Sequence, residues 1–230
     1  NKLTPDNYDV LNSKAKLTLN NDKFDFTAGF ESYENLQLIS SDRYQYILPY
    51  YSLDKQIFSE FDKGFINFTS IGSNDLNNTN NLKTKVINDL NFQSLDLLTD
   101  YGFKNNYNIY MKNLNTTAKN DSQYKSSPQV ELMSIFEFSS SLPMINQTKN
   151  STNYLTPKFS FRFNPGDMKN YSNTDRKISV SNIFDINRLG IDDSFEEGKS
   201  LTMGLDFKKT SILDINKFFE AKLATVYREK

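Results

Sequence analysis

The chain has 230 residues, of which 37% are hydrophobic and 24% are charged, and it contains no histidine, cysteine or tryptophan. Its net charge of -1 argues against a nucleic-acid partner, because nucleic-acid-binding proteins carry a surplus of basic residues. Without cysteine the chain has no disulfide framework, thiol nucleophile or thiolate metal ligand. Without histidine it lacks the usual general base and the commonest transition-metal ligand. We therefore expect no conventional histidine-dependent enzyme and no cofactor.

Hydrophobic and polar residues alternate along much of the chain, which predicts β-strands. The first such stretch places Phe24, Phe26, Ala28 and Phe30 on one face, and the triplet 20–22 before it predicts a tight hairpin. Further alternating stretches follow at 44–50, 159–163, 201–207 and 219–227.

Polar segments between these stretches predict the connections. We expect them at 73–81, 116–128, 146–153 and 164–174. Residues 211–223 also fit helical spacing, but the segments on both sides alternate, so we predict a strand there. The whole of 1–230 is predicted to be a single all-β antiparallel meander of about ten to twelve strands with no internal domain boundary.

Such alternation is typical both of a transmembrane barrel and of a soluble β-sandwich. Three features favour the barrel. Charged residues, such as Lys23 and Asp25, lie opposite the aromatic faces, as a wet lumen tolerates. Aromatic residues recur near the expected strand ends, at Tyr50, Tyr51 and 101–103, as in an interfacial girdle. Long polar connections suit a cell surface. We predict a segment of a large transmembrane outer-membrane β-barrel.

No run reaches the roughly 18 consecutive apolar residues that a membrane-spanning helix needs. The chain starts at Asn1 without a methionine and without a secretory signal, so we expect it to be a segment of a longer protein.

Two runs in the carboxyl-terminal third resemble the lipopolysaccharide-assembly outer-membrane protein family (LptD). Leu155–Met168 is similar to a strand and turn of that family. Asn182–Gly190, followed by Asp193–Leu205, is similar to its pattern of an Asn-Arg turn, a short acidic loop that ends in glycine, and a strand that begins Leu-Thr-x-Gly. Upstream, 41–49 is similar to earlier strands of the family's barrel. The resemblance is specific over 155–207.

The resemblance implies a central-to-late part of the family's barrel, with the periplasmic domain and the remaining strands missing from this sequence. It implies a non-enzymatic translocon in the cell outer membrane of a Gram-negative bacterium that inserts lipopolysaccharide into the outer leaflet. The implied partners are lipopolysaccharide, a plug lipoprotein of the assembly complex, a periplasmic lipopolysaccharide bridge protein and outer-membrane lipids. The alternatives are a general outer-membrane porin and a soluble secreted β-sandwich that acts as a binding module.

Few residues suggest chemistry on their own. Asp192, Asp193, Glu196 and Glu197 could supply oxygen ligands to a divalent cation, but the spacing of a calcium loop is missing, and we interpret them as a solvated acidic turn. A glycosidase carboxylate pair is less favoured, because nothing places these residues in a cleft. We assign no catalytic, cofactor-binding or metal residue, and the substrate-binding residues stay unassigned.

Two arginines, one glycine and two prolines are also of interest. Arg162 should lie on the lumen side, opposite Phe161 and Phe163, in a structural ion pair in preference to a ligand contact. Arg188 should fix the turn in which it lies. Gly204 should mark a bulge or a close backbone approach, and Pro49 and Pro157 should weaken strand pairing locally.

Overall fold

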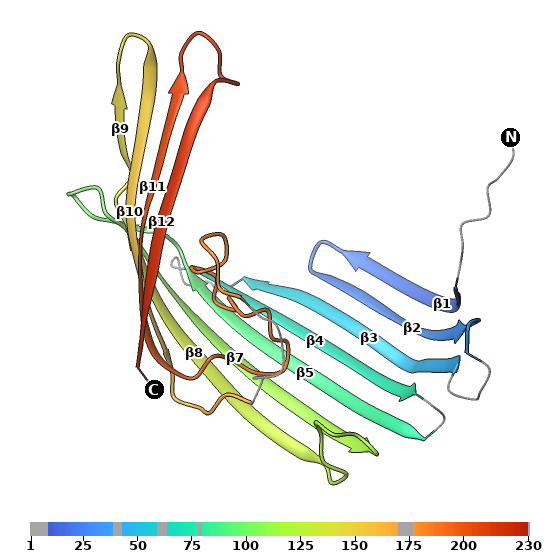
Figure 1. Ribbon diagram of the computed structural model, residues 1–230. Helices are drawn as coiled ribbons and strands as arrows, with labels where there is room; N and C mark the ends of the chain where they lie inside the picture. Colours follow the sequence, from blue (N-terminus) through green and yellow to red (C-terminus); the bar gives the residue numbers. More distant parts are fainter. Residues whose placement is uncertain (1–8, 39–42, 59–63, 78–79, 170–176, 230) are drawn as a thin grey trace, which may run out of the picture. The chain divides into compact units, whose positions relative to one another are not determined.

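The computed structural model describes residues 9–38, 43–58, 64–77, 80–169 and 177–229 (Figure 1). These ranges contain twelve β-strands and no α-helix. The strands are β1 (Val10–Asn21), β2 (Phe24–Asn35), β3 (Tyr44–Phe58), β4 (Gly64–Asn77), β5 (Asn81–Ser94), β6 (Leu97–Leu98), β7 (Lys104–Lys119), β8 (Gln129–Ser141), β9 (Met144–Gln147), β10 (Ser151–Asn164), β11 (Gly198–Ser211) and β12 (Phe218–Glu229).

The strands form one sheet in the order β1-β2-β3-β4-β5-β7-β8-β10-β11-β12, with the short β6 paired to β7 and the short β9 paired to β10. The long strands thus follow one another in chain order, which confirms the predicted all-β antiparallel meander. In the described sheet β1 and β12 are the two end strands. None of the described residues belongs to a helix long and apolar enough to cross a membrane.

The chain divides into two compact units, which share four of the long strands along their length. The first unit comprises 1–58, 66–90 and 112–132, and the second comprises 59–65, 91–111 and 133–230.

In the first unit, the hairpin predicted at 20–22 is present, because Asn21 of β1 pairs with Phe24 of β2. The pairing of β2 with β3 contains a bulge: Gly29 pairs with Tyr50 and Glu31 with Ile47, so that Leu48 and Pro49 together oppose one residue. This confirms the weakened pairing predicted at Pro49. Tyr50 lies well inside β3, so the strand-end position predicted for it and for Tyr51 is wrong. Tyr101 and Phe103, in the second unit, do lie just before β7.

Polar side chains of the first unit form a hydrogen-bonded ladder across neighbouring strands. The Tyr51 hydroxyl lies 3.2 Å from the Ser70 hydroxyl, which donates to the Asn88 side-chain oxygen at 2.7 Å. The Asn88 amide then donates to the Asn113 side-chain oxygen at 3.1 Å. Four strands, β3, β4, β5 and β7, are thereby linked through short polar side chains as well as through their backbones.

Several connections differ from the predicted ones. β4 extends to Asn77 and β5 begins at Asn81, so most of the connection expected at 73–81 is strand. β9 and β10 form a hairpin that takes up most of 146–153, and residues 212–217 form a turn between β11 and β12 where a continuous strand was expected. The connection expected at 164–174 instead runs from 165 to 197. We call residues 165–197 the long loop, of which 170–176 lie outside the described residues.

In the second unit the burial of polar and hydrophobic side chains is the reverse of that in a soluble sheet. Along β10, Ser160, Arg162 and Asn164 are buried, whereas the alternate residues Phe161 and Phe163 are 37% and 38% exposed. We call the side with Ser160, Arg162 and Asn164 the polar face, and the opposite side the apolar face. This placement confirms that Arg162 lies opposite Phe161 and Phe163.

The same inversion extends beyond β10. Among the described residues, buried polar or charged side chains outnumber buried hydrophobic ones two to one. Large hydrophobic side chains are exposed in both units, for example Leu17 of β1, Leu132 of β8 and Leu223 of β12. A soluble sheet buries its hydrophobic side, so exposed hydrophobic side chains of this number mark a surface that contacts another protein or a membrane.

We predict that the purified 230-residue chain aggregates in buffer without lipid or detergent. The exposed hydrophobic side chains and the outer edges of β1 and β12 would both associate with other copies. Size-exclusion chromatography with and without detergent tests this expectation. A monodisperse monomer that melts cooperatively in plain buffer would contradict it.

Candidate functional site

The long loop contacts the polar face of the second unit, where Arg188 of the loop bonds to Thr202 and Arg162 of β10 bonds to Ile186 of the loop. The described part of the loop is drawn in orange in Figure 1. A tight turn at its centre begins at Asn187, whose side chain accepts from the Ile191 amide at 2.9 Å and donates to the Ile191 carbonyl at 2.8 Å. The Gly190 amide donates to the Asn187 carbonyl at 2.9 Å, and Gly190 has a positive φ of 60° that suits glycine. Ile183, Ile191 and Phe195 are buried and anchor the loop.

Arg188 fixes this turn, as predicted, and also ties it to the sheet. Its guanidinium donates to both carboxylate oxygens of Glu196, at 2.6 Å and 2.9 Å. The remaining terminal nitrogen donates to the Thr202 hydroxyl of β11 at 3.2 Å. With 2% of its surface exposed, Arg188 is a buried cation held by a two-pronged ion pair.

A row of four side chains crosses the polar face beneath Glu196. Arg162 of β10 pairs in register with Glu137 of β8 on one side and with Ser200 of β11 on the other. Ser200 in turn pairs with Arg228 of β12. Directly opposed residues of antiparallel strands point to the same face, so these four side chains lie in a line across four strands.

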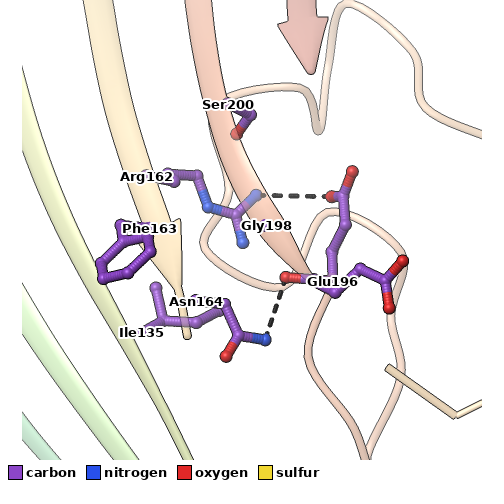
Figure 2. A pocket seen from close by; sticks show the side chains of 8 residues that line it. Ile135, Arg162, Phe163, Asn164, Glu196, Gly198 and Ser200 are labelled. Carbon is purple, nitrogen blue, oxygen red and sulfur yellow. Dashed lines mark hydrogen bonds and ion pairs between the residues drawn. The ribbon is translucent and has the colours of Figure 1, made fainter. Parts of the chain in front are cut away.

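Three arginines converge on the single carboxylate of Glu196. Besides the pair with Arg188, Arg228 Nη1 donates to Glu196 Oε1 at 2.7 Å, and Arg162 Nη1 lies 3.8 Å from Glu196 Oε2 (Figure 2). Arg162 Nη2 donates to the Ile186 carbonyl of the loop, and Arg162 Nε lies 3.8 Å from Glu137 Oε2. The ion pair predicted for Arg162 is thus present, at 3.8 Å to each of two carboxylates. We call Glu137, Arg162, Arg188, Glu196 and Arg228 the arginine cluster.

A small cavity lies beside the cluster, lined among others by Ile135, Asn164 and Ser200 (Figure 2). Asn164 at its edge donates from its side-chain amide to the Glu196 carbonyl at 3.1 Å, which holds the loop backbone next to the end of β10. The cavity offers only about 10 Å³ for the centre of a solvent molecule, which is room for one water.

A second contact between the loop and the polar face involves Gly204 of β11. A Cβ atom at Gly204 would lie 2.8 Å from the Phe184 ring, so the ring occupies the space that a side chain would need. Lys158 Nζ lies 4.3 Å from the centre of the same ring and 2.8 Å from the Asp206 carboxylate. The strand register continues through Gly204 on both sides, so the bulge predicted there is absent. The predicted close approach is present, but it comes mainly from an aromatic ring.

Pro157 coincides with an interruption of the sheet. β8 ends at Ser141, opposite Lys158, and β9 starts at Met144, opposite Leu155. Between them only the Leu142 amide is bonded to the Pro157 carbonyl, at 3.0 Å. The weakened pairing predicted at Pro157 is therefore confirmed on the side that faces β8 and β9.

The four acidic residues of the loop separate in the structure. Asp193 is buried and the Glu196 side chain is 9% exposed, and both contact cations, since Lys169 Nζ lies 3.7 Å from Asp193 and the arginines surround Glu196. Glu197 accepts from the Met168 amide at 3.2 Å, and Asp192 is exposed. The interpretation as a solvated turn is thus wrong for Asp193 and Glu196. Within the described ranges no group of three or more potential ligand residues is arranged to hold a metal ion.

Charges around Glu196 shift its acidity. Burial of the carboxyl raises its pKa, but the hydrogen bonds from Arg188 and the positive charges of Arg188, Arg228 and Arg162 together hold the pKa below the ordinary value of 4.5. The loop is thus fastened to the sheet by an anion that stays ionised in mildly acidic solution.

No protein-family model matches the chain, and no curated protein matches it at a significant level.

We predict that Glu196→Gln destabilises the protein by about 3 kcal/mol near neutral pH, because buried arginines lose their anionic partner. Since the pKa of Glu196 is lowered in the folded state, the stabilisation is complete above 4.5 and disappears as the pH falls through the lowered value. Thermal midpoints of both proteins in detergent, from about pH 8 down to about pH 3, should therefore differ most near neutrality and converge in acid.

Glu197→Gln is the matched control, because it removes the same charge from the next residue. We expect a much smaller change in its thermal midpoint. An equal effect of the two substitutions, or a Glu196→Gln difference that persists in acid, would contradict the role given to Glu196.

Proposed function

We propose that the chain forms part of the wall of an outer-membrane β-barrel that delivers lipopolysaccharide to the outer leaflet. The observation that supports a barrel wall is the inversion of the sheet, with hydrophobic side chains exposed and polar side chains covered. In a barrel wall the apolar face contacts lipid and the polar face lines the lumen. A soluble sandwich would need a second sheet over the hydrophobic side, and the described strands belong to a single sheet.

The resemblance of residues 155–207 to the LptD family supports lipopolysaccharide as the cargo. The Asn-Arg turn of that pattern begins at Asn187, its acidic loop carries Glu196, and its strand is β11. The turn, the acidic loop and the strand of this pattern therefore form one local structure, in which Arg188 and Glu196 attach the loop to the polar face.

In this proposal the polar face accommodates the sugars of lipopolysaccharide while the acyl chains remain in the bilayer. The protein acts without covalent chemistry, in the outer membrane of a Gram-negative bacterium. Its partners are the plug lipoprotein inside the barrel and the periplasmic bridge protein that supplies the lipid. Export through the wall requires a seam of weakly paired strands, because every backbone group in lipid must otherwise be paired.

A general porin is the second candidate function. The observation that favours it is the long loop folded onto the polar face, since a porin also carries a loop that narrows its lumen. In that case the polar face would pass small hydrophilic solutes and would not receive a lipid.

The barrel-wall assignment predicts opposite environments for adjacent residues of β12. The chain has no native cysteine, so a single cysteine at Leu223 on the apolar face or at Ala224 on the polar face can carry a fluorophore. In lipid vesicles, quenchers attached to acyl chains should quench the label at 223 far more strongly, and iodide in water should favour the label at 224. Equal quenching at both positions would contradict a membrane wall.

The cargo assignment predicts the result of depleting the protein in its own cells. Newly made lipopolysaccharide should fail to reach the cell surface and should accumulate at the inner membrane, as measured by surface labelling and membrane fractionation. Normal surface lipopolysaccharide with reduced uptake of small hydrophilic solutes would instead identify a porin. Normal results in both assays would exclude both functions.

A further inference from the structure

The arginine cluster leaves two donors of Arg162 and one carboxylate oxygen of Glu137 without hydrogen bonds. Arg162 Nε and Nη1 are buried and have no hydrogen-bond partner, although the Arg162 side chain is only 6% exposed. Both ion pairs of Arg162, with Glu137 and with Glu196, are 3.8 Å long, which is beyond hydrogen-bonding distance. A buried guanidinium with free donors is costly, so the cluster can accept a further or a larger anion.

The geometry of the row suits a group with several oxygens. Arg162 and Arg228 flank Ser200 on the two neighbouring strands, so their Cα atoms lie about 10 Å apart, which is twice the strand spacing. Glu196 reaches both arginines from the loop, with its carboxylate 3.8 Å from Arg162 and 2.7 Å from Arg228. Ser200, Arg162 and Glu196 line the same small cavity (Figure 2). A tetrahedral oxyanion in this space could accept from both guanidinium groups and from the Ser200 hydroxyl.

The charge balance permits a phosphate. The three arginines carry three positive charges, and Glu137, Glu196 and the nearby Asp185, whose charge also acts on Arg162, carry three negative ones. A phosphate monoester has a charge of about -1.5 to -2 at pH 7. If it replaced the Glu196 carboxylate, the net charge of these groups would change by about one unit or less.

We propose that the Arg162–Ser200–Arg228 row is a binding site for a phosphate group, and that Glu196 occupies this site as an internal competitor. The cavity beside Glu196 has room for only one water, so phosphate enters when the Glu196 side chain withdraws. Arg228, whose side chain is 52% exposed, provides the route from solvent. Withdrawal of Glu196 also breaks its pair with Arg188, so binding loosens the long loop from the sheet.

This inference goes beyond the proposed function, because it concerns anion chemistry and holds whether the barrel exports a lipid or passes solutes. The phosphate group could belong to a free ion or to a phosphorylated lipid headgroup. Two arms of the experiment separate these sources.

The first arm titrates the detergent-solubilised full chain with inorganic phosphate by isothermal titration calorimetry. Removing a tethered competitor raises affinity in proportion to its local concentration, so Glu196→Gln should bind phosphate about tenfold more tightly than the unmodified chain or more. Arg228→Gln added to Glu196→Gln should abolish that gain, whereas Glu197→Gln should bind like the unmodified chain. Equal phosphate affinity for the unmodified chain and Glu196→Gln, or a gain that survives Arg228→Gln, would overturn the proposal.

A second measurement avoids the Glu196 variant. In the unmodified chain, saturating phosphate should increase hydrogen exchange of residues 186–197, because the loop loses its ionic contact with the sheet. Arg228→Gln should not show this increase. Unchanged or slower exchange in the unmodified chain, both with free phosphate and with the phosphorylated lipid of the second arm, would overturn the proposal.

The second arm replaces free phosphate with detergent micelles that contain phosphatidic acid, and uses micelles with phosphatidylcholine as the control. Increased exchange of residues 186–197 with phosphatidic acid alone identifies a lipid headgroup as a ligand, and increased exchange with free phosphate alone identifies a soluble one. No response to either would overturn the proposal. Such a result would not affect the proposed role in lipopolysaccharide export, because the depletion experiment tests that role independently of this site.

Discussion

Buried polar side chains must find partners, and most of the structure follows from this constraint, because the sheet covers its polar side and exposes its hydrophobic side. The two units satisfy it in different ways. In the first unit uncharged polar side chains bond to one another from strand to strand, as in the ladder from Tyr51 to Asn113. In the second unit longer charged side chains are covered by the loop, which supplies the Glu196 carboxylate and the Ile186 carbonyl. Asparagine and serine are thus useful inside this sheet, where a soluble protein would place valine or leucine.

The arginine cluster makes the loop and the strands depend on each other. Charges taken out of water are expensive, and an ion pair repays that cost only when its geometry is good. Arg188 and Glu196 meet this condition, whereas Arg162 is held at longer distances between two carboxylates. Glu196 of the loop therefore balances the charge of Arg162, but two nitrogens of Arg162 remain without a hydrogen-bond acceptor. This mismatch distinguishes the cluster from a purely structural ion pair.

The sequence was sufficient for the local features that depend on neighbours in the chain. Alternation predicted the strands around Phe26 and Phe161, and the restricted backbone of Pro49 and Pro157 predicted where pairing weakens. Alternation could also place Arg228 on the same side as Lys222, but it could not show that Ser200 lies between Arg162 and Arg228, because register is set by distant strands. The long loop was missed for a related reason. Its turn and acidic residues resemble an ordinary surface connection until the partners of Arg188 and Phe184 on β11 are known.

The row from Glu137 to Arg228 has a consequence for how the sheet is assembled. Side chains alternate between faces, so a slip of β10 by one residue against its neighbours would carry Arg162 to the side of Phe136 and would leave Glu137 facing an aromatic ring. A slip by two residues would return hydrophobic side chains to the same face, whereas a row of opposite charges across four strands is complementary in one alignment. The cluster therefore also favours one strand register during folding, because misaligned pairings separate the opposite charges and are less stable.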